Sequence, residues 1–220
     1  DGVQRRWPTT YYGPDTGIAM AMRETRPDGG QRVGIVGLGT GTLAAYGRKG
    51  DRYTFYEIDP DVIDLAQREF SYLSDSAATI EIHEGDARLV LERQPAQRFD
   101  VLVVDAFSGD AIPMHLLTRE AFMLYASHLT GRGVLAVNVS NRYLRLAPVV
   151  RQSAAASGME ARVVDTVGDA SRLYYQATWV IATRDPAFFA SASLRTAQPI
   201  TRPVAPWTDD FSSIYRAVRW

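Results

Sequence analysis

A glycine-rich turn between two short apolar runs constrains the fold of this chain most strongly. The first run, Val33 to Val36, leads into Gly-Leu-Gly-Thr-Gly. An alanine-bearing segment and a second apolar run follow, and that run ends in Glu57-Ile-Asp59. This order predicts a strand, a glycine turn, a helix and a second strand that closes on a carboxylate. Such a unit is typical of a Rossmann-like α/β fold.

The same unit is suited to bind a nucleoside. Glycines let the backbone approach a ligand closely, and the N-terminus of the helix offers free N–H groups. An acid at the end of the second strand can accept hydrogen bonds from both ribose hydroxyls. The predicted ligand contacts from this unit are Gly37, Gly39, Thr40, Gly41, Glu57 and Ile58.

The spacing of the glycines favours an S-adenosylmethionine-type site over a dinucleotide site. The dinucleotide fingerprint places its third glycine at the position of Thr42, whereas this chain has it at Gly41. A further acid, Asp86, follows a third apolar run and is next to Ala87; an acceptor there can bind the adenine amino group. The alternative is a Rossmann-like turn without a ligand, but the three features agree in order and spacing.

The rest of the chain alternates between strands and helices. Strands are expected near 32–37, 52–57, 78–82, 99–105, 133–139, 161–167 and 175–183. Helices are expected over 41–48, 60–71, 87–94, 115–128 and 144–157. Only a polar, glycine-bearing loop separates the last two strands, so these should pair antiparallel.

Two segments lie outside this alternation. Residues 1–30, interrupted by Pro8 and by Gly13-Pro14, are predicted to form a small β-rich lead-in or hairpin. The second segment is the tail from Ala197 to Trp220. Residues 31–220 are predicted to form the nucleoside-binding domain, and the tail is expected to pack back over it.

Asp105, at the end of the fourth strand, is the candidate catalytic acid or base. In doubly wound sheets, ligands bind beyond the carboxyl ends of the strands, and the fourth strand normally lies beside the first. Asp105 should therefore face the crevice of the glycine turn, where a carboxylate can hold a cationic amine or take its proton. The alternative is that it caps the following segment. Trp7, Tyr11 and Tyr12 are either packing residues or one wall of a substrate pocket.

Composition and charge argue against several classes of function. The 220 residues carry a net charge of −1 without a block of like charges, so nothing indicates nucleic acid or a membrane surface as a partner. Cysteine is absent, and His83, His115 and His128 lack metal-ligand spacing, so no metal is expected. No apolar stretch approaches the length of a membrane span. Because the chain begins at Asp1, we expect it to be a piece of a longer protein.

Taken together, these segments resemble the spermidine/spermine synthase family, the polyamine aminopropyltransferases. Within the family they are most similar to bacterial synthase-like domains fused to, or encoded with, membrane segments. The residues that carry the likeness are Thr10 to Pro14, Gly37 to Gly41, Tyr56 to Asp59, Glu84 to Ala87, Val104 to Asp110, Val139 to Tyr143 and Trp207 to Asp210. The resemblance implies an α/β fold of the class I S-adenosylmethionine methyltransferase type, a Rossmann-like seven-stranded sheet with a small N-terminal β segment.

The resemblance also implies a reaction. An amine attacks S-adenosylmethionine or its decarboxylated form, and methylthioadenosine leaves. Asp105 would deprotonate the amine, Glu57 would hold the ribose and Asp86 would lie near the adenine. The implied catalytic residues are Asp105, Tyr12 and Asp110. The implied amine-binding residues are Tyr11, Tyr12, Tyr175 (with Tyr174 as its competing neighbour) and Asp110. The implied donor-binding residues are Gln4, Gly37, Gly39, Thr40, Gly41, Glu57, Ile58, Asp86, Ala87 and Asp105.

Two positions depart from the family pattern. Thr40 stands where the synthases carry an aspartate, in a GGGDGG loop that grips the ammonium of the decarboxylated donor. Asp110 lies five residues after Asp105, whereas the family's second aspartate follows three residues after the first. Losing the loop aspartate weakens selection for the decarboxylated cation. Methyl transfer, opening of S-adenosylmethionine to methylthioadenosine, and nucleoside sensing without catalysis are therefore alternatives.

The expected partners are a small-molecule amine and the S-adenosyl co-substrate, without nucleic acid. The resemblance further suggests a homodimer, and a membrane segment N-terminal to this chain. It implies a cytoplasmic location, which for a longer, membrane-attached protein would be the cytoplasmic face of the membrane.

Overall fold

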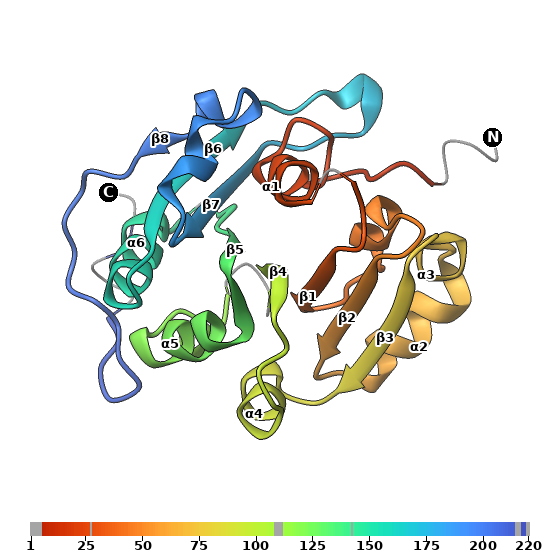
Figure 1. Ribbon diagram of the computed structural model, residues 1–220, viewed down its shortest axis with the longest axis horizontal. Helices are drawn as coiled ribbons and strands as arrows, with labels where there is room; N and C mark the ends of the chain where they lie inside the picture. The colour runs from red at the N-terminus through yellow and green to blue at the C-terminus, as the bar shows by residue number, and fades with distance from the viewer. Residues whose placement is uncertain (1–5, 27, 108–111, 142, 214–216, 219–220) are drawn as a thin grey trace.

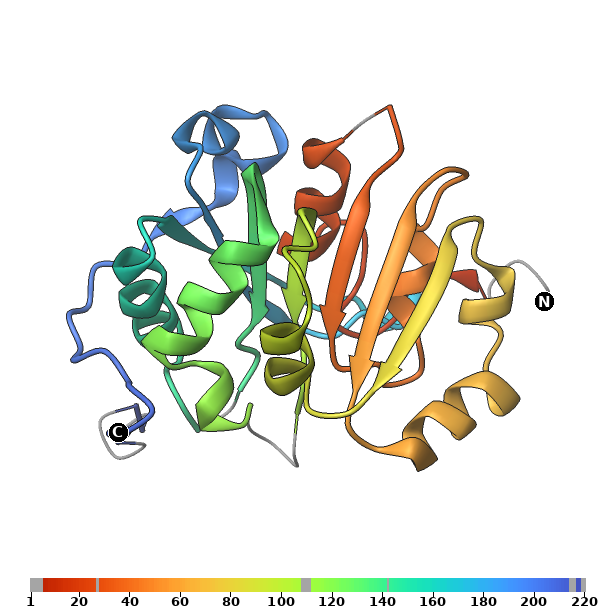
Figure 2. The same cartoon turned by 60° about the horizontal axis from the view of Figure 1, so that its bottom comes forward.

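The computed structural model describes residues 6–26, 28–107, 112–141, 143–213 and 217–218. Their central feature is a mostly parallel sheet flanked by helices on both faces (Figures 1 and 2). Its strands are β1 (Arg32–Val36), β2 (Arg52–Glu57), β3 (Thr79–Glu84), β4 (Phe99–Val104), β5 (Leu129–Asn138), β6 (Glu160–Thr166), β7 (Ala177–Thr183) and β8 (Gln198–Pro199). They lie in the order β3-β2-β1-β4-β5-β7-β6-β8.

The sheet confirms the α/β fold class and all seven predicted strands. Strands β3, β2, β1, β4 and β5 pair parallel, because each connection crosses over the sheet through a helix or turn. As predicted, β6 and β7 pair antiparallel. The expected number of strands is wrong by one, because Gln198 and Pro199 of the tail add a short antiparallel strand beside β6.

Two apolar clusters fill the two faces of the sheet. The helices are α1 (Gly17–Thr25), α2 (Pro60–Glu69), α3 (Tyr72–Asp75), α4 (Ala87–Arg93), α5 (Arg119–His128) and α6 (Ala147–Ala156). Helices α4, α5 and α6 lie together on one side (Figures 1 and 2) and share a buried cluster with Leu102, Leu135 and Val180. Helices α1 and α2 bury apolar side chains against the opposite face, where Trp179 is fully buried.

The predicted β-rich lead-in is wrong, because this segment contains helix α1. The Thr16 side chain caps the helix by accepting a hydrogen bond from Ala19 N. Gly17 is a packing residue rather than a helix breaker: a Cβ on it would lie 2.7 Å from Trp179 Cβ. Among the described residues before β1, extended pairing is limited to an isolated bridge between Thr10 and Tyr174.

The helices after the first core strand differ from expectation mainly at their ends. The helix predicted over 41–48 is the 3₁₀ turn η2 (Thr42–Tyr46), preceded by Gly41 in the left-handed region and followed by Gly47. The helix predicted over 60–71 is α2, which ends at Glu69, and the short α3 follows from Tyr72. Asp59 caps α2 ahead of Pro60, whose missing N–H is not needed in a first turn. Further 3₁₀ turns are η3 (Met114–Leu116), η4 (Ala170–Arg172), η5 (Pro186–Ala190) and η6 (Ser193–Thr196).

The C-terminal tail packs back over the domain, as predicted. Trp207 is 3% exposed, and its carbonyl accepts a hydrogen bond from Arg119 N at the start of α5. Val218 forms an isolated bridge with Leu144. None of the helices in the described ranges is long and apolar enough to cross a bilayer.

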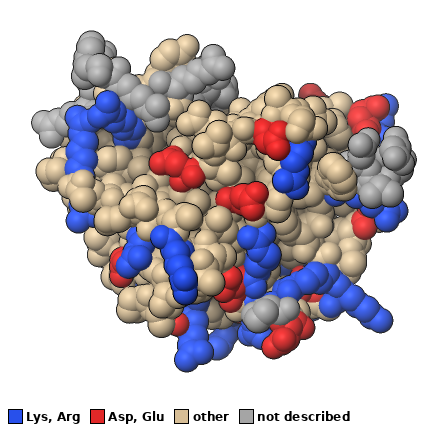
Figure 3. All heavy atoms as spheres, turned by 90° about the horizontal axis from the view of Figure 1, so that it is seen from above, with Lys and Arg blue, Asp and Glu red and all other residues tan. Residues whose placement is uncertain are grey.

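Surface charges of both signs are distributed over the face shown in Figure 3. Lys and Arg side chains gather mainly along the lower edge of this view, and several acidic side chains lie nearer its centre. Because the two signs are interspersed among the described residues, this face does not present one large field of a single sign.

Candidate active site

The glycine turn lies at the carboxyl end of β1, directly against the segment that leaves β4. Gly37 has φ 95°, and a Cβ on it would lie 2.6 Å from the backbone oxygen of Asp105. Gly37 N donates to Tyr56 O at 2.8 Å, and Asp105 N donates to Val36 O at 2.9 Å. Strand β1 lies between β2 and β4, so this is the point at which the strand order reverses and where ligands bind in such sheets.

Glu57 ties the end of β2 to the glycine turn. Its Oε2 accepts from Leu38 N at 2.8 Å, and its Oε1 accepts from Asp59 N at 3.0 Å. A carboxylate has about four acceptor positions, so each oxygen keeps one for a ribose hydroxyl. The neighbouring Ile58 side chain is 65% exposed and offers an apolar surface for a base. Above Gly39 the space is open, as a closely bound ligand requires.

Thr40, at the position where the family pattern has an aspartate, forms a side-chain hydrogen bond within its own turn. Its Oγ1 lies 2.8 Å from Thr42 Oγ1. This turn therefore carries a neutral hydroxyl at the position for which the family resemblance implies a carboxylate.

Asp86 has a structural role that the sequence analysis did not identify. Its Oδ1 caps α4 by accepting from Arg88 N and Leu89 N, both at 3.0 Å. Its Oδ2 lies 3.2 Å from His115 Nε2. Ala87, the first residue of α4, is 7% exposed. The contact between Asp86 and an adenine stays a prediction.

Asp105 lies at the carboxyl end of β4 and is held by two side chains. Tyr12 OH donates to its Oδ2 at 2.7 Å, and Asn138 Nδ2 donates to its Oδ1 at 2.8 Å. Burial raises the pKa of Asp105 to about 6, although both hydrogen bonds oppose this shift. Among the described residues its carboxylate contacts side chains rather than backbone N–H groups, unlike the capping aspartates 59 and 86.

Aromatic residues form the wall beside Asp105. The Tyr12 ring packs 6.4 Å from the Trp179 ring, and Tyr46 OH donates to the Tyr12 carbonyl. Burial raises the pKa of Tyr12 well above 10, so its phenol remains a donor. Tyr11 and Tyr175 meet edge to face at 5.6 Å and are 38% and 54% exposed. Tyr12 is thus both a packing residue and part of the crevice.

The neighbouring Tyr174 has a packing role. A Cβ on Gly13 would lie 3.0 Å from its ring, so this glycine makes room for it. Trp7, by contrast, is 41% exposed, and its carbonyl accepts a hydrogen bond from Tyr72 OH at 2.9 Å.

Two predicted site residues, Gln4 and Asp110, lie outside the described residues. Sequence analysis missed Asn138, which is 1% exposed at the end of β5. The available signal was a polar residue that directly follows the apolar run Val134 to Val137, in a strand that runs beside β4. Asp209, in the segment Trp207 to Asp210 that carries part of the family likeness, pairs with Arg88 and accepts from Thr118 Oγ1 at 2.8 Å.

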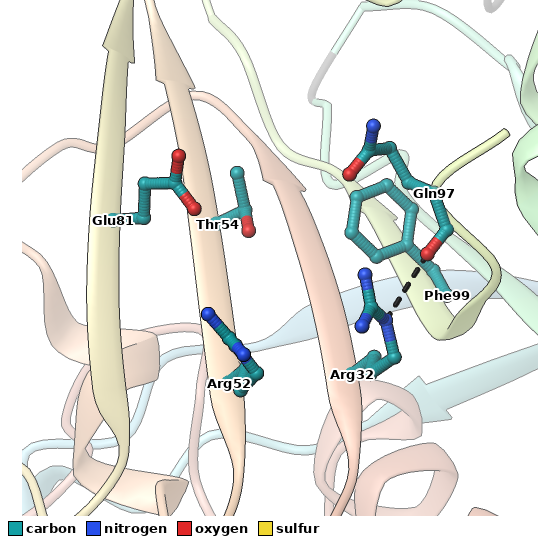
Figure 4. Close-up of a pocket in the computed structure, with 6 residues that line it drawn as sticks. All are labelled: Arg32, Arg52, Thr54, Glu81, Gln97 and Phe99. Carbon is teal, nitrogen blue, oxygen red and sulfur yellow. Dashed lines mark hydrogen bonds between the residues drawn. The ribbon is translucent and has the colours of Figure 1, made fainter. Parts of the chain in front are cut away.

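A separate hollow of about 280 Å³ lies near the amino ends of the strands (Figure 4). Its lining residues are Arg32, Arg52, Thr54, Glu81, Gln97 and Phe99. Arg32 and Arg52 are register partners at the starts of β1 and β2. The hollow is therefore separated from the glycine turn by the length of these strands. Among the described residues, no group of three or more His, Cys, Asp and Glu side chains could hold a metal ion.

Part of this chain is similar in sequence to curated proteins of known name. The polyamine aminopropyltransferase of Vibrio vulnificus is 37% identical over 113 residues, which is 49% of this chain and 37% of that protein. A probable polyamine aminopropyl transferase of Bifidobacterium longum is 32% identical over 136 residues, covering 59% and 28%. In sequence, this chain is similar to these two polyamine aminopropyltransferases. It spans well under half the length of either relative, and no family model matches it.

Solved structures of other proteins have the same fold as this chain. A probable spermidine synthase from Corynebacterium glutamicum has a TM-score of 0.64 at 21% identity, covering 82% of this chain and 71% of that one. A precorrin-6y C5,15-methyltransferase from Geobacter metallireducens has a TM-score of 0.60 at 13% identity, covering 77% and 89%. The fold is therefore of the class I methyltransferase type. The membrane-fused branch stays a prediction.

Proposed function

We propose that this chain transfers the aminopropyl-type arm of an S-adenosyl donor to an amine and releases methylthioadenosine. The observation that carries the proposal is the placement of Asp105, a carboxylate of raised pKa, against the glycine turn at the switch point of the sheet. The sequence similarity to two proteins named as polyamine aminopropyltransferases supports the same reaction.

The proposed step is a displacement at carbon. The lone pair of the amine nitrogen forms a bond to the methylene carbon of that arm next to the sulfonium. The carbon–sulfur bond breaks, and its electron pair neutralises the sulfur, so methylthioadenosine leaves uncharged. The ammonium formed on the nitrogen passes its proton to Asp105. Such a reaction depends mainly on positioning and on proton removal.

The remaining residues hold the donor in place. Glu57 offers acceptors to the ribose, the glycine turn lets the donor approach β1, and Ile58 covers the base. Tyr11 and Tyr175 line the entrance for the amine, because aromatic faces attract cations.

Donor choice is the finer part of the proposal. With Thr40 in the turn, we expect S-adenosylmethionine to bind at least as well as its decarboxylated form. Thr40→Asp should shift preference toward the decarboxylated donor, because a carboxylate attracts the ammonium of that donor and repels the carboxylate of the other. Calorimetry with both donors on both proteins measures this. Strong preference of the wild type for the decarboxylated donor would contradict the role given to Thr40.

Mass spectrometry of products tests the function. The protein is incubated with each S-adenosyl donor and a panel of amines. Methylthioadenosine together with an alkylated amine supports the proposal. S-adenosylhomocysteine indicates methyl transfer, methylthioadenosine without an alkylated amine indicates opening of the donor, and binding without turnover indicates a sensing domain. Asp105→Asn should strongly reduce product formation, whereas Asp64→Asn, which removes an exposed carboxylate paired with Arg68 on α2, should not.

A further inference from the structure

Asn138 is a buried amide whose orientation the backbone dictates. Its Oδ1 accepts a hydrogen bond from Ser140 N at 3.0 Å. Because only the oxygen of an amide can accept from an N–H group, the Nδ2 group must face the other way, toward Asp105. That nitrogen donates to Asp105 Oδ1 at 2.8 Å.

The sheet holds this donor rigidly. Asn138 is the last residue of β5 and pairs with Trp179 of β7. Just beyond it, Val139 N donates to Thr178 O at 2.9 Å, and Ser140 Oγ accepts from Thr178 N at 3.0 Å. A supporting group on a strand is placed more rigidly than one on a free loop.

Uncharged hydrogen-bond donors stabilise the ionised form of Asp105. Among the described residues the side chains that contact its carboxylate are uncharged: the Tyr12 phenol from the N-terminal segment and the Asn138 amide from β5. Tyr11 and Tyr46 are the titratable groups packed next to Tyr12. A partly buried carboxylate without a cationic partner stays ionised at neutral pH only if hydrogen bonds stabilise its charged form.

We propose that Asn138 is a positioning residue that keeps Asp105 ionised and fixed in one orientation toward the crevice. A phenol can donate to a carboxylate or accept from a carboxylic acid, so Tyr12 can serve either form. The amide nitrogen of Asn138 can only donate, and it therefore favours the charged form. The importance of this charge for catalysis rests on the proposed function, but the charge itself is measurable without any substrate.

The test is a carbon-13 NMR titration of the Asp105 carboxyl group in the substrate-free protein. Asn138→Leu removes the donor and should raise the pKa of Asp105 by about one to two units. Asn138→Asp keeps the shape and the acceptor for Ser140 N, but it puts a second carboxylate against the first, so it should raise that pKa at least as much. Ser140→Ala removes only the hydroxyl that meets Thr178 and should leave the pKa unchanged.

The pH profile of activity then links the charge to turnover. In both Asn138 variants the acidic limb of kcat/KM should move upward with the pKa of Asp105, and much of the loss should be recovered at high pH. An unchanged pKa in the folded variants would overturn the proposal and leave Asn138 a structural residue. If the Leu variant does not fold, the Asp variant carries the test. A shifted pKa in a protein that transfers nothing would overturn the proposed function and leave the role of Asn138 in setting the charge intact.

Discussion

At the scale of single residues, Asp105 combines a raised pKa with two fixed hydrogen bonds. A base must be ionised to accept a proton, and the pKa of Asp105 is about 6. Activity should therefore fall as the pH drops through about 6 and level off above it. Asp105→Asn keeps the shape but removes the basicity.

We expect Asp105→Asn to reduce turnover by ~10²–10⁴-fold, the usual cost of losing a positioned general base. Binding of methylthioadenosine should change little, because Glu57 and the glycine turn hold that part of the ligand. Steady-state kinetics and calorimetry on the folded variant measure both effects. Near-wild-type turnover would show that Asp105 is not the base.

Glu57 is the residue whose loss should weaken nucleoside binding most directly. Glu57→Ala should cost on the order of 1–3 kcal/mol of binding free energy for methylthioadenosine, the range for a buried or charge-assisted hydrogen bond. Since Glu57 also accepts from Leu38 N and Asp59 N, Glu57→Gln serves as the milder variant that keeps one acceptor. If calorimetry shows unchanged affinity for methylthioadenosine in a folded Glu57→Ala protein, Glu57 does not bind the ribose.

At the scale of elements, α4 begins at Asp86, which caps the helix and is predicted to contact the adenine as well. Asp86→Ala removes the cap and should lower the free energy of unfolding by ~1 kcal/mol. Asp86→Asn keeps a capping oxygen, so stability should be nearly unchanged. It also presents an amide donor to the adenine amino group, so methylthioadenosine should bind more weakly. Denaturant unfolding measures the effect on stability, and calorimetry measures the effect on binding of methylthioadenosine. If Asp86→Asn binds methylthioadenosine as tightly as the wild type, Asp86 acts only as a helix cap.

At the scale of the whole molecule, the tail is fastened to the domain by Asp209. The Arg88 guanidinium holds the pKa of this carboxyl down at about 2, and Thr118 adds a further hydrogen bond. Because the pKa is lower in the folded state, the contact stabilises the fold at pH values above 3.8, the pKa of this carboxyl in the unfolded chain. This contribution is lost as the pH falls from about 4 toward 2.

Asp209→Asn should lower the free energy of unfolding at pH 7 by ~1 kcal/mol or less, because solvent screens this partly exposed pair. The difference from the wild type should shrink as the pH approaches 2. Urea unfolding at several pH values measures this. Asp210→Asn is the matched control. A constant difference at every pH would show that the ion pair is not the cause.

The sequence alone determined where the strands lie along the chain and where the candidate site is expected. Long apolar runs must be strands covered on both faces, and glycines between two of them must form a tight turn, so both follow from local chain physics. Glu57 and Asp105 were found in the same way, because a polar residue that ends an apolar strand emerges at the edge where ligands bind.

Only the tertiary structure decided what those residues touch. Gly17 lies in helix α1, where its missing side chain leaves space for Trp179, a residue far along the sequence. Asn138 and Tyr12 reach Asp105 across separations of 33 and 93 residues. No local pattern encodes such contacts, because they depend on which strands become neighbours when the sheet assembles. The charge of the proposed base is set by those contacts and by its burial.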